Sequence, residues 1–389
     1  MLDVAFVGTG ADPDDPGQDG FAMAYRHANG YERLDDCRLA ACADVVPANA
    51  RAFAETYDVP DDRVYEDYER MLHEAEPDVV SVCVPPAVHA EIVRGAARTG
   101  VPAAIHCEKP MATTWRDALG MARACKEAGV KLSINHQRRV GPIYREAKSL
   151  VDDGTVGALR RVEWSAKNLF DSGTHQFDLA NFFADDADVE WVLAALDYSE
   201  ENRWFGAHNE NQAIAQWRYE TGVYGQATTG RTADALGPRV RLVGTDGTIE
   251  VGADDGPPLR VRTGDGSWSA IDAGENLWGD ARYDLPRNAL YALGERLPVP
   301  GLPTRPDYPS HVDRAIASVV GSVRDGGQSP LRAERALDAT ELIFAAWESV
   351  RRRGRVELPL EIRDNPLEAM VEDGVLDVEA ETDAATADD

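Results

Sequence analysis

The first 135 residues alternate between short apolar segments and longer amphipathic segments. Apolar runs of strand length lie at residues 3–7, 39–43, 79–84, 102–106 and 131–135. Apolar residues three and four positions apart predict helices between these runs, at residues 21–28, 48–57, 65–75, 89–99 and 114–128. Strands that alternate with helices form a parallel sheet through right-handed crossovers. The pattern therefore predicts an α/β fold that binds its ligand beyond the carboxyl ends of the strands.

The pattern changes after residue 160, where apolar and polar residues alternate. It predicts strands at residues 160–166, 213–219, 223–229, 240–243 and 248–251. A long amphipathic helix is expected over residues 331–353 and is expected to pack between two domains. With 389 residues, the chain is long enough for two cores. We expect a dinucleotide-binding domain at 1–134, a second α/β domain at 135–365 and an acidic, disordered tail at 366–389.

The charge of the chain limits its partners. A formal net charge of −28 would repel a phosphate backbone, so we expect no nucleic-acid partner. The 35 arginines and 5 lysines resemble the acidic, lysine-poor composition of proteins from salt-accumulating archaea, in which salt screens self-repulsion. An acidic mesophilic protein with a charged tail is the alternative, but the carboxylates are spread along the whole chain.

The cysteines and the apolar runs indicate the cellular compartment in which the protein resides. The five cysteines include no CxxC pair, and we expect reduced core residues with no disulfide or metal role. No segment approaches the roughly 20 apolar residues of a membrane helix, and the amino terminus lacks the pattern of a signal peptide. We therefore expect a cytoplasmic protein without a membrane partner.

Glycines follow the first strand, at Gly8 and Gly10. Glycines at this place let the backbone approach a pyrophosphate before the chain turns into a helix. The third glycine of the usual fingerprint is replaced by Pro13, and the segment 12–19 carries four aspartates. Gly17 or Gly20 is an alternative source of the close approach, and both are equally compatible with an ordinary loop.

Asp44 ends the second strand, where an acidic residue can accept hydrogen bonds from both hydroxyls of an adenosine ribose. This favours NAD over NADP, which stays open. Asp44 could also cap the helix that begins near Pro47. At the same sheet edge, on the cofactor side, Pro85 lies in a proline-rich loop, and His89 begins the next helix as a structural residue rather than a catalyst.

Lys109 is one of five lysines in the chain and lies in the tripeptide Glu108-Lys109-Pro110, directly after the fourth strand. Sixty-two residues later, Asp171, His175 and Asp178 would share one face of a helix. These three side chains suit a pocket that abuts an apolar stripe. A zinc site and a solvated helix face are the alternatives.

Together these motifs resemble the Gfo/Idh/MocA family of oxidoreductases, which includes glucose-fructose oxidoreductase and inositol dehydrogenases. The resemblance covers about residues 1–360. It implies a Rossmann domain followed by an α/β domain with a large, mostly antiparallel open sheet, through which a homodimer or homotetramer would form. The segments that carry it are Gly8-Thr9-Gly10, Asp44, Val84-Pro85-Pro86 with His89, Glu108-Lys109-Pro110, Asn135 with Arg139, and residues 171–178.

The resemblance also implies roles for individual residues. Lys109, Asp171 and His175 match the catalytic trio, Glu108 and Pro110 match cofactor-side residues, and the bond before Pro110 is expected to be cis. Oxidation of an alcohol needs a base and a cation beside the oxygen. His175, with an unperturbed pKa of about 6.5, suits the base or the acid. Lys109 suits the cation, and burial would lower its pKa enough to let it share protons, so we expect Lys109 and His175 to act as an acid/base pair. Asp171 would orient His175 or a substrate hydroxyl.

Polar side chains near the expected cleft suit a polyhydroxylated ligand such as a sugar, a sugar acid or a cyclitol. We expect substrate contacts from Asn135, Lys167, Asn168 and Asp178. Two other functions stay open: an NAD-binding, sugar-sensing regulator without turnover, and an NAD-assisted glycosidase of related fold.

Overall fold

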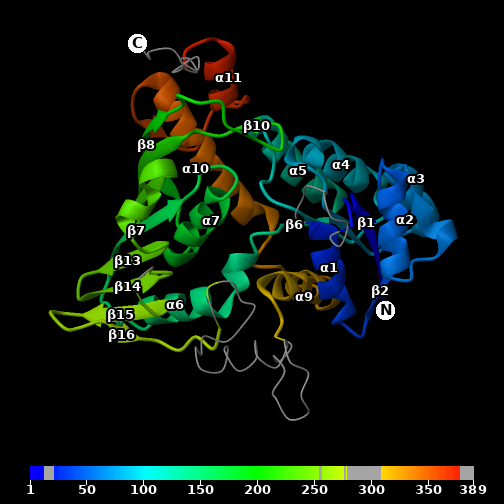
Figure 1. The fold of residues 1–389 in the computed structure, drawn as a ribbon, viewed down its shortest axis with the longest axis horizontal. Coiled ribbons are helices and arrows are strands. Elements are labelled where there is room, and N and C mark those ends of the chain that lie inside the picture. The colour runs from blue at the N-terminus through cyan, green and yellow to red at the C-terminus, as the bar shows by residue number, and fades with distance from the viewer. Residues whose placement is uncertain (13–21, 254–255, 276, 278–307, 377–389) are drawn as a thin grey trace, which may run out of the picture.

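The computed structural model describes residues 1–12, 22–253, 256–275, 277 and 308–376, which form two α/β lobes (Figure 1). The aspartate-rich loop from residue 13 onward, with Gly17 and Gly20, lies outside the described residues, as does the acidic tail from residue 377.

The described residues of the N-terminal lobe form a six-stranded sheet in the order β3-β2-β1-β4-β5-β6, and every pairing is parallel. This strand order is that of doubly wound dinucleotide-binding sheets, and it confirms the predicted α/β class. Only β3 had no predicted counterpart, because two residues carry no periodic signal. The strands are β1 (Leu2–Val7), β2 (Cys37–Ala43), β3 (Val64–Tyr65), β4 (Val79–Val82), β5 (Ala104–Cys107) and β6 (Lys131–Ile134).

Helices cover both faces of this sheet (Figure 1). One face carries α1 (Met23–Glu32) and α2 (Pro47–Thr56), which pack with Phe6 of β1. The other face carries α3 (Tyr68–Ala75), α4 (Pro86–Thr99) and α5 (Trp115–Ala128).

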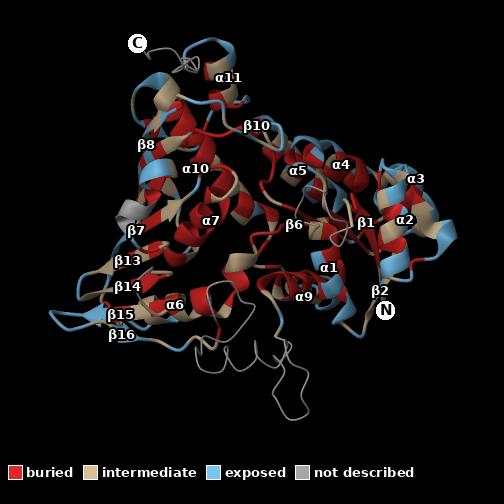
Figure 2. Cartoon of the chain, in the orientation of Figure 1, coloured by how far each residue is buried: buried red, intermediate tan, exposed pale blue. Residues whose placement is uncertain are grey.

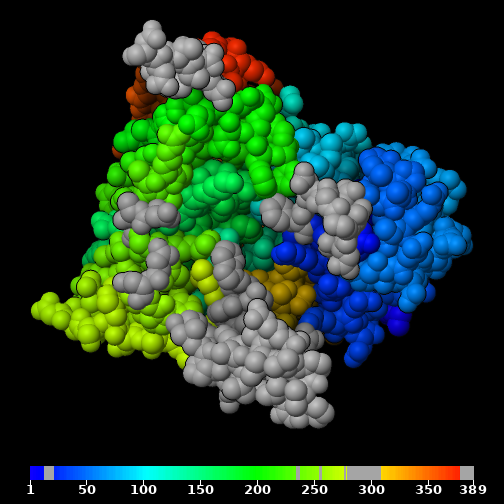
Figure 3. Space-filling model, viewed as in Figure 1, coloured from blue at the N-terminus to red at the C-terminus, as the bar shows by residue number. Residues whose placement is uncertain are grey.

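A segment from the second half of the chain completes the N-terminal lobe. The helix α9 (His311–Arg324) packs against α1, and its Ile316 and Val319 are fully buried in the same core as Phe6. In the space-filling view α9 is the gold surface between the blue N-terminal lobe and the rest (Figure 3). We expected residues 135–365 to form the second domain alone, but the sheet face beside α1 needs this apolar cover.

The described residues of the C-terminal lobe form a nine-stranded sheet, called the large sheet below, in the order β16-β15-β14-β13-β7-β12-β11-β8-β17. Only β7 and β12 pair in parallel, so the predicted large, mostly antiparallel sheet is confirmed. Its strands are β7 (Leu159–Ala166), β8 (Val189–Asp197), β11 (Gln212–Tyr219), β12 (Tyr224–Thr229), β13 (Val240–Gly244), β14 (Gly247–Val251), β15 (Leu259–Thr263), β16 (Ser269–Ala270) and β17 (Val356–Glu357).

The helices α6 (Pro142–Asp152), α7 (Gly173–Phe183) and α10 (Ala333–Arg352) lie on the side of the large sheet that faces the N-terminal lobe (Figure 1). Both α7 and α10 are mostly buried (Figure 2). Because α10 contacts β8 and α7 as well as α5 and β6, it packs between the lobes as predicted.

The expectation of a disordered tail from residue 366 is wrong for its first part. Residues Pro366–Glu372 form α11, and Leu367 and Met370 on its inner face are buried in the core. Asn365 caps this helix by accepting from the backbone N–H groups of Leu367 and Glu368. In the described part of the chain, no helix combines the length and apolar character needed to cross a membrane.

Candidate active site

The glycine loop after β1 is held by the carboxylate of Asp44. The Oδ2 atom of Asp44 accepts from the backbone N–H groups of Thr9 and Gly10, at 2.8 and 3.0 Å. Gly8 has a φ of +81°, and a Cβ there would lie 2.4 Å from a methyl group of Val84, so only glycine fits. Gly10, with a φ of +67°, borders open space. The fold therefore brings the two glycines and Asp44, which the sequence analysis singled out, together at one edge of the sheet.

The structure does not support the alternative role of Asp44 as a helix cap. The N-cap of α2 is Val46, which has no side-chain capping bond, and within the described residues the one donor to Asp44 Oδ1 is the backbone N–H of Val46, at 2.8 Å. The Asp44 carboxylate is therefore committed to the glycine loop, and Oδ1 keeps capacity for a further donor.

A cavity of about 560 Å³ opens beside this loop. Its wall runs from the cofactor-side residues Gly10, Pro85 and Glu108 to Lys109 and Asp171, and it also includes Phe205. A cavity at the carboxyl ends of parallel strands, between two lobes, is the usual place for a ligand in such folds.

Lys109 and Asp171 meet in this cavity and join the two lobes. The Lys109 Nζ lies 2.7 Å from Asp171 Oδ1 and 3.3 Å from the Asp171 carbonyl oxygen. Both side chains remain partly exposed, at 23% and 17%. The Lys109–Pro110 bond is cis, as predicted. Asp171 does not lie on the helix as expected, because α7 begins only at Gly173, and Asp171 belongs to the preceding turn.

A buried hydrogen-bond cluster lies beneath Lys109. Glu108 Oε1 lies 2.9 Å from His27 Nε2 on α1 and 2.6 Å from Asn135 Nδ2 at the end of β6. Burial would raise the pKa of Glu108, but the hydrogen bonds and charges of His27, Asn135 and Lys109 outweigh it and lower the pKa to about 2. Glu108 is therefore a buried carboxylate that fixes the backbone on which Lys109 is carried.

This cluster changes the role of Asn135, which we expected to contact substrate. Asn135 is fully buried and its amide donates to Glu108, so it supports the site from below. His27 was missed, because a single histidine in an apolar helix looks like an ordinary core residue. Its distance of 81 residues from Glu108 gives no local signal.

His89 connects two loops of the cavity wall. Its ring nitrogens lie 2.9 Å from the carbonyl oxygen of Pro110 and 2.8 Å from that of Val84, and the side chain is fully buried. Burial lowers the pKa of His89, so the ring is neutral and donates to one carbonyl at a time. We expected His89 on the cofactor side as a structural residue, and its two carbonyl contacts fit that structural role.

His175 lies on the first turn of α7 and is 5% exposed. Its pKa is held well below the usual range by burial first and then by the nearby charges of Arg138 and Lys109. The unperturbed value therefore does not describe this imidazole, whose lowered pKa keeps it neutral at neutral pH and makes it a weaker base. Within the described residues, Nδ1 of His175 is buried without a hydrogen-bond partner.

Asp178 does not converge with Asp171 and His175. Its carboxylate accepts from Arg139 Nε at 3.0 Å, and its Oδ1 lies 3.6 Å from His136 Nδ1. The side chain is 1% exposed, and Arg139 lowers its pKa despite burial. A substrate would have to displace this buried ion pair, so the expected substrate contact is replaced by a structural role.

The other expected substrate residues lie on the turn that carries Asp171. Asn168 is 3% exposed, and its Oδ1 accepts from the backbone N–H of Ser172 at 2.9 Å, which closes the turn. Lys167 is exposed, and its Nζ lies 5.1 Å from the ring centroid of Trp204. Of the four expected substrate residues, only Lys167 is exposed.

Glu210 anchors this turn from the core. It is fully buried, and its Oε1 accepts from the backbone N–H of Leu169 at 2.6 Å and from the Thr229 hydroxyl at 2.9 Å. Burial raises the pKa of Glu210 to about 7. No sequence pattern marked this residue; only its partners, 41 and 19 residues away, show its role.

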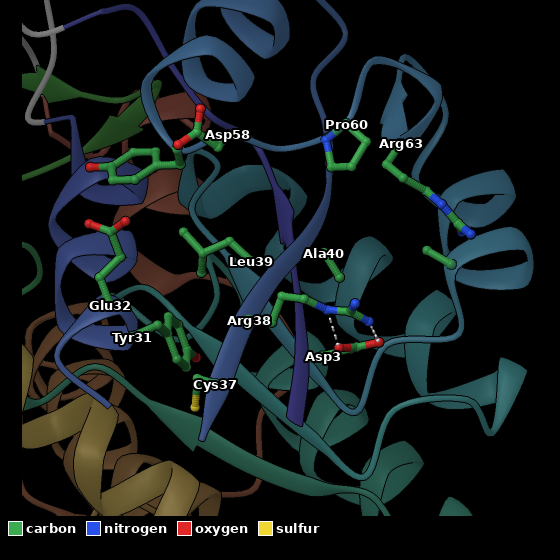
Figure 4. A pocket seen from close by; sticks show the side chains of 12 residues that line it. Asp3, Tyr31, Glu32, Cys37, Arg38, Leu39, Ala40, Asp58, Pro60 and Arg63 are labelled. Atoms are coloured by element: carbon green, nitrogen blue, oxygen red, sulfur yellow. Dashed lines mark hydrogen bonds and ion pairs between the residues drawn. The ribbon is translucent and has the colours of Figure 1, made fainter. Parts of the chain in front are cut away.

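A second cavity, of about 530 Å³, lies at the amino ends of β1 and β2, around the ion pair of Arg38 and Asp3 (Figure 4). It contains none of the expected site residues, and it lies at the opposite end of the sheet from the place where doubly wound folds bind their ligands. Among the described residues, no group of three or more His, Cys, Asp or Glu side chains is arranged to hold a metal ion.

The raised pKa of Glu210 predicts a pH-dependent stability. The carboxyl proton of Glu210 is bound more tightly in the folded state than in the unfolded state, where the pKa is about 4.5. Its contribution to the free energy of unfolding is therefore fully present below about pH 4.5 and is lost as the pH rises through about 7. Glu210→Gln keeps an acceptor for Leu169 and removes the titration. Urea unfolding between pH 5 and 8 should show a decline of up to roughly 3 kcal/mol in the wild type that is smaller in Glu210→Gln. The exposed control Glu220→Gln should follow the wild type; identical slopes in all three proteins would contradict the assignment.

Comparisons with known proteins agree with this geometry. Residues 3–136 match the Gfo/Idh/MocA oxidoreductase family with its NAD-binding Rossmann fold, and residues 163–250 match the Gfo/Idh/MocA C-terminal domain. D-apiose dehydrogenase of Paraburkholderia graminis is 27% identical over 85% of this chain and 86% of its own length. Inositol 2-dehydrogenase of Rhizobium meliloti is 25% identical over 62% and 76%.

The fold also matches solved structures. Aldose-aldose oxidoreductase from Caulobacter crescentus, complexed with glycerol, superposes with a TM-score of 0.70 at 21% identity, over 92% of this chain and 99% of that one. The two family models match the chain in the same order as the two lobes. The Rossmann model covers the lobe with the parallel sheet, and the C-terminal model covers most strands of the large sheet. This chain therefore belongs to the Gfo/Idh/MocA family of NAD-binding oxidoreductases.

Proposed function

We propose that this protein is an NAD(P)-dependent dehydrogenase that transfers a hydride between nicotinamide and a hydroxyl-bearing carbon of a sugar, a sugar acid or a cyclitol. The observation that carries the proposal is the Lys109–Asp171 pair, at 2.7 Å, in the same cavity as the glycine loop. The names of relatives, D-apiose dehydrogenase and inositol 2-dehydrogenase, support the substrate class.

The cavity fits a dinucleotide. Gly10 borders open space where a side chain would otherwise lie, so a pyrophosphate can approach the backbone. Asp44 Oδ1 has capacity for a ribose hydroxyl, and its negative charge would repel the additional phosphate of NADP. These features favour NAD as the cofactor, which supplies the acceptor for the hydride.

The protein side chains handle the proton and the developing charge. When the substrate C–H bond breaks, its electron pair leaves with the hydride, and the hydroxyl proton must go to a base. The lowered pKa keeps His175 neutral, so its ring has a nitrogen free to take this proton. The same shift makes the imidazole a weaker base, and Lys109 offsets this by making the substrate hydroxyl more acidic. The ammonium of Lys109 can donate to the substrate oxygen and stabilise negative charge on it, while Asp171 orients the ammonium.

The positive charges near His175 support a sugar acid within this class. Arg138 and Lys109 both act on the imidazole, and Arg138 Nη1 donates to the amide oxygen of Gln176 at 3.3 Å. A substrate carboxylate would be attracted by these two positive charges, in a protein whose net charge of −28 is otherwise repulsive to anions.

A substrate panel tests the proposal. The protein, which we propose to be cytoplasmic in a salt-accumulating cell, is mixed with NAD or NADP and with aldoses, cyclitols or aldonic acids in molar KCl. Reduced nicotinamide is followed by its absorbance. Turnover with NAD is expected. NAD binding without any reduction would favour the sugar-sensing regulator, and release of an alcohol from a glycoside without net reduction would favour the NAD-assisted glycosidase.

The role of Lys109 has its own test. Lys109→Ala should lower kcat by roughly 100-fold or more, the size typical of a lost acid/base or oxyanion contact, and leave NAD affinity nearly unchanged. Steady-state rates and NAD titrations measure the two effects. Lys126→Ala, which removes an exposed lysine on α5, is the matched control. Unchanged turnover in Lys109→Ala would refute the assignment.

We also propose that copies of the chain associate as a homodimer or homotetramer through the open face of the large sheet. Leu193 of β8, Ile214 of β11 and Tyr224 of β12 are 43–47% exposed and lie on the same face of neighbouring strands. Ile214→Asp should shift the assembly toward monomer in light scattering, whereas Leu119→Ala, at an exposed position of α5, should not. A wild-type monomer would contradict the proposal.

A further inference from the structure

A third cavity, called the α10 cavity below, lies at the amino end of α10. Its volume is about 250 Å³, and its described wall shares no residue with the wall of the catalytic cavity. The wall combines the second half of α5, the strand β6 and the segment that joins α9 to α10. In Figure 1, α10 is drawn in orange and begins beside β6. The polar groups of this cavity are separate from those that we assign to the dehydrogenase reaction.

No side chain caps the amino end of α10, which is a helix of 20 residues. Its N-cap is Arg332, and an arginine side chain has donors but no acceptor. The first backbone N–H groups of a helix have no acceptor within the helix, and the helix dipole gives them partial positive charge. Ala333 and Glu334, at the first two helical positions, line the cavity. An anion in this cavity would therefore face the positive end of the helix.

Ser133 of β6 is buried in the same wall without a hydrogen-bond partner. It is 3% exposed, and among the described residues no group donates to its hydroxyl or accepts from it. Two other serines of the wall are bonded: the Ser322 hydroxyl donates to the carbonyl oxygen of Val319 at 2.7 Å, and the Ser329 Oγ lies 3.0 Å from the Ser318 Oγ. A buried hydroxyl is rarely left without a partner, because its lost bond to water is then not replaced. Ser133 therefore indicates a ligand that accepts its hydrogen bond.

Two positive charges border Ser133. Lys131 lies two positions earlier on β6 and therefore on the same side of the strand. Its ammonium donates to the carbonyl oxygen of Gly327 and has two further hydrogens to donate. Arg332 lies opposite Ser133 in an antiparallel bridge, and in the part of the chain that the structure describes its guanidinium has no ion pair. The one carboxylate in the described wall, Glu334, is exposed, so positive charge prevails in the cavity.

We propose that the α10 cavity binds a phosphate group, either as inorganic phosphate or as part of a small phosphate ester. The Ser133 hydroxyl and the amino end of α10 would donate hydrogen bonds to the phosphate oxygens, and Lys131 and Arg332 would balance the charge. A cavity of about 250 Å³ has room for a small organic group beside the phosphate. The proposal does not depend on the dehydrogenase reaction, because no group of the catalytic cavity takes part in it.

A phosphate at this place would join β6 of the N-terminal lobe to α10. The two elements already meet there, since the backbone N–H of Ile134 donates to the carbonyl oxygen of Leu331 at 2.9 Å. Two residues after Ser133, Asn135 donates to Glu108 in the wall of the catalytic cavity. An anion that is held by β6 and α10 together is held only by the folded chain, so phosphate should raise the stability of the protein.

Thermal unfolding with inorganic phosphate tests the site. The melting temperature is recorded with increasing potassium phosphate at constant KCl concentration and pH, and calorimetry measures the Kd for phosphate. The wild type should show a saturable rise in melting temperature. Arg332→Gln and Ser133→Ala should each weaken phosphate binding roughly 10-fold, because each loses a hydrogen bond to a charged group.

Ser133→Ala also separates a ligand contact from a structural role. Without phosphate this variant should be at least as stable as the wild type, because it removes a buried hydroxyl that has no partner. At a phosphate concentration that saturates the wild type, the variant should be the less stable of the two. A lower melting temperature without phosphate, together with an unchanged Kd for phosphate, would assign Ser133 a purely structural role and overturn the proposal.

Matched variants control for each change. Ser322→Ala removes a hydroxyl of the same wall that is already bonded to Val319, and Arg353→Gln removes an exposed arginine at the other end of α10. Both should keep the wild-type Kd for phosphate. Lys109→Ala should keep it too, since only phosphate bound in the catalytic cavity would depend on that ammonium. Absence of saturable binding in the wild type, or binding that is lost in Lys109→Ala, would contradict the assignment.

Glycerol phosphate in the same titrations distinguishes the two forms of the ligand. Binding that is tighter than that of inorganic phosphate, and that weakens in Arg332→Gln, would assign the cavity to a phosphate ester. Equal or weaker binding would assign it to the free ion. If Arg332→Gln and Ser133→Ala bind both compounds as tightly as the wild type does, the α10 cavity is not a phosphate site.

Discussion

The ion pair between Lys109 and Asp171 is the contact on which the site depends, because its two partners come from different lobes. Lys109 follows β5 of the parallel sheet, and Asp171 precedes α7 on the large sheet. Neither side chain is deeply buried, so the pair gains little stability from its charge alone. Its value is geometric: it places an ammonium group at the junction of the cofactor loop and the substrate side.

Both partners are fixed by buried carboxyl groups that do not touch the substrate. Glu108 is locked by His27 and Asn135 beneath Lys109, and Glu210 holds the turn that carries Asp171. Buried groups of this kind are costly unless they are fully hydrogen-bonded, and they then restrict a backbone to one arrangement. Lys109 and Asp171 can therefore stay partly exposed to a ligand while their backbones keep fixed positions relative to each other.

Sequence patterns predicted the elements and the centre of the site but not its supports. Periodicity located most of the parallel strands. Gly10, Lys109 and Asp171 do line one cavity, and Asp44 holds the glycine loop beside it. The same helical spacing also placed Asp178 there, but spacing defines a face, not its partner, and Arg139 pairs with that carboxylate inside the protein. His27 and Glu210 had no local signal, since their roles arise from contacts with residues 81 and 41 positions away.

A double-mutant cycle on kcat/KM measures most directly whether Lys109 and Asp171 act as one unit. Lys109→Ala, Asp171→Ala and the double variant are compared with the wild type, with the melting temperature recorded for each. If Asp171 acts by orienting Lys109, the double variant should be about as slow as Lys109→Ala alone, since groups that act together are strongly non-additive. Losses that multiply independently would contradict the account, because the two side chains would then contribute separately to the reaction.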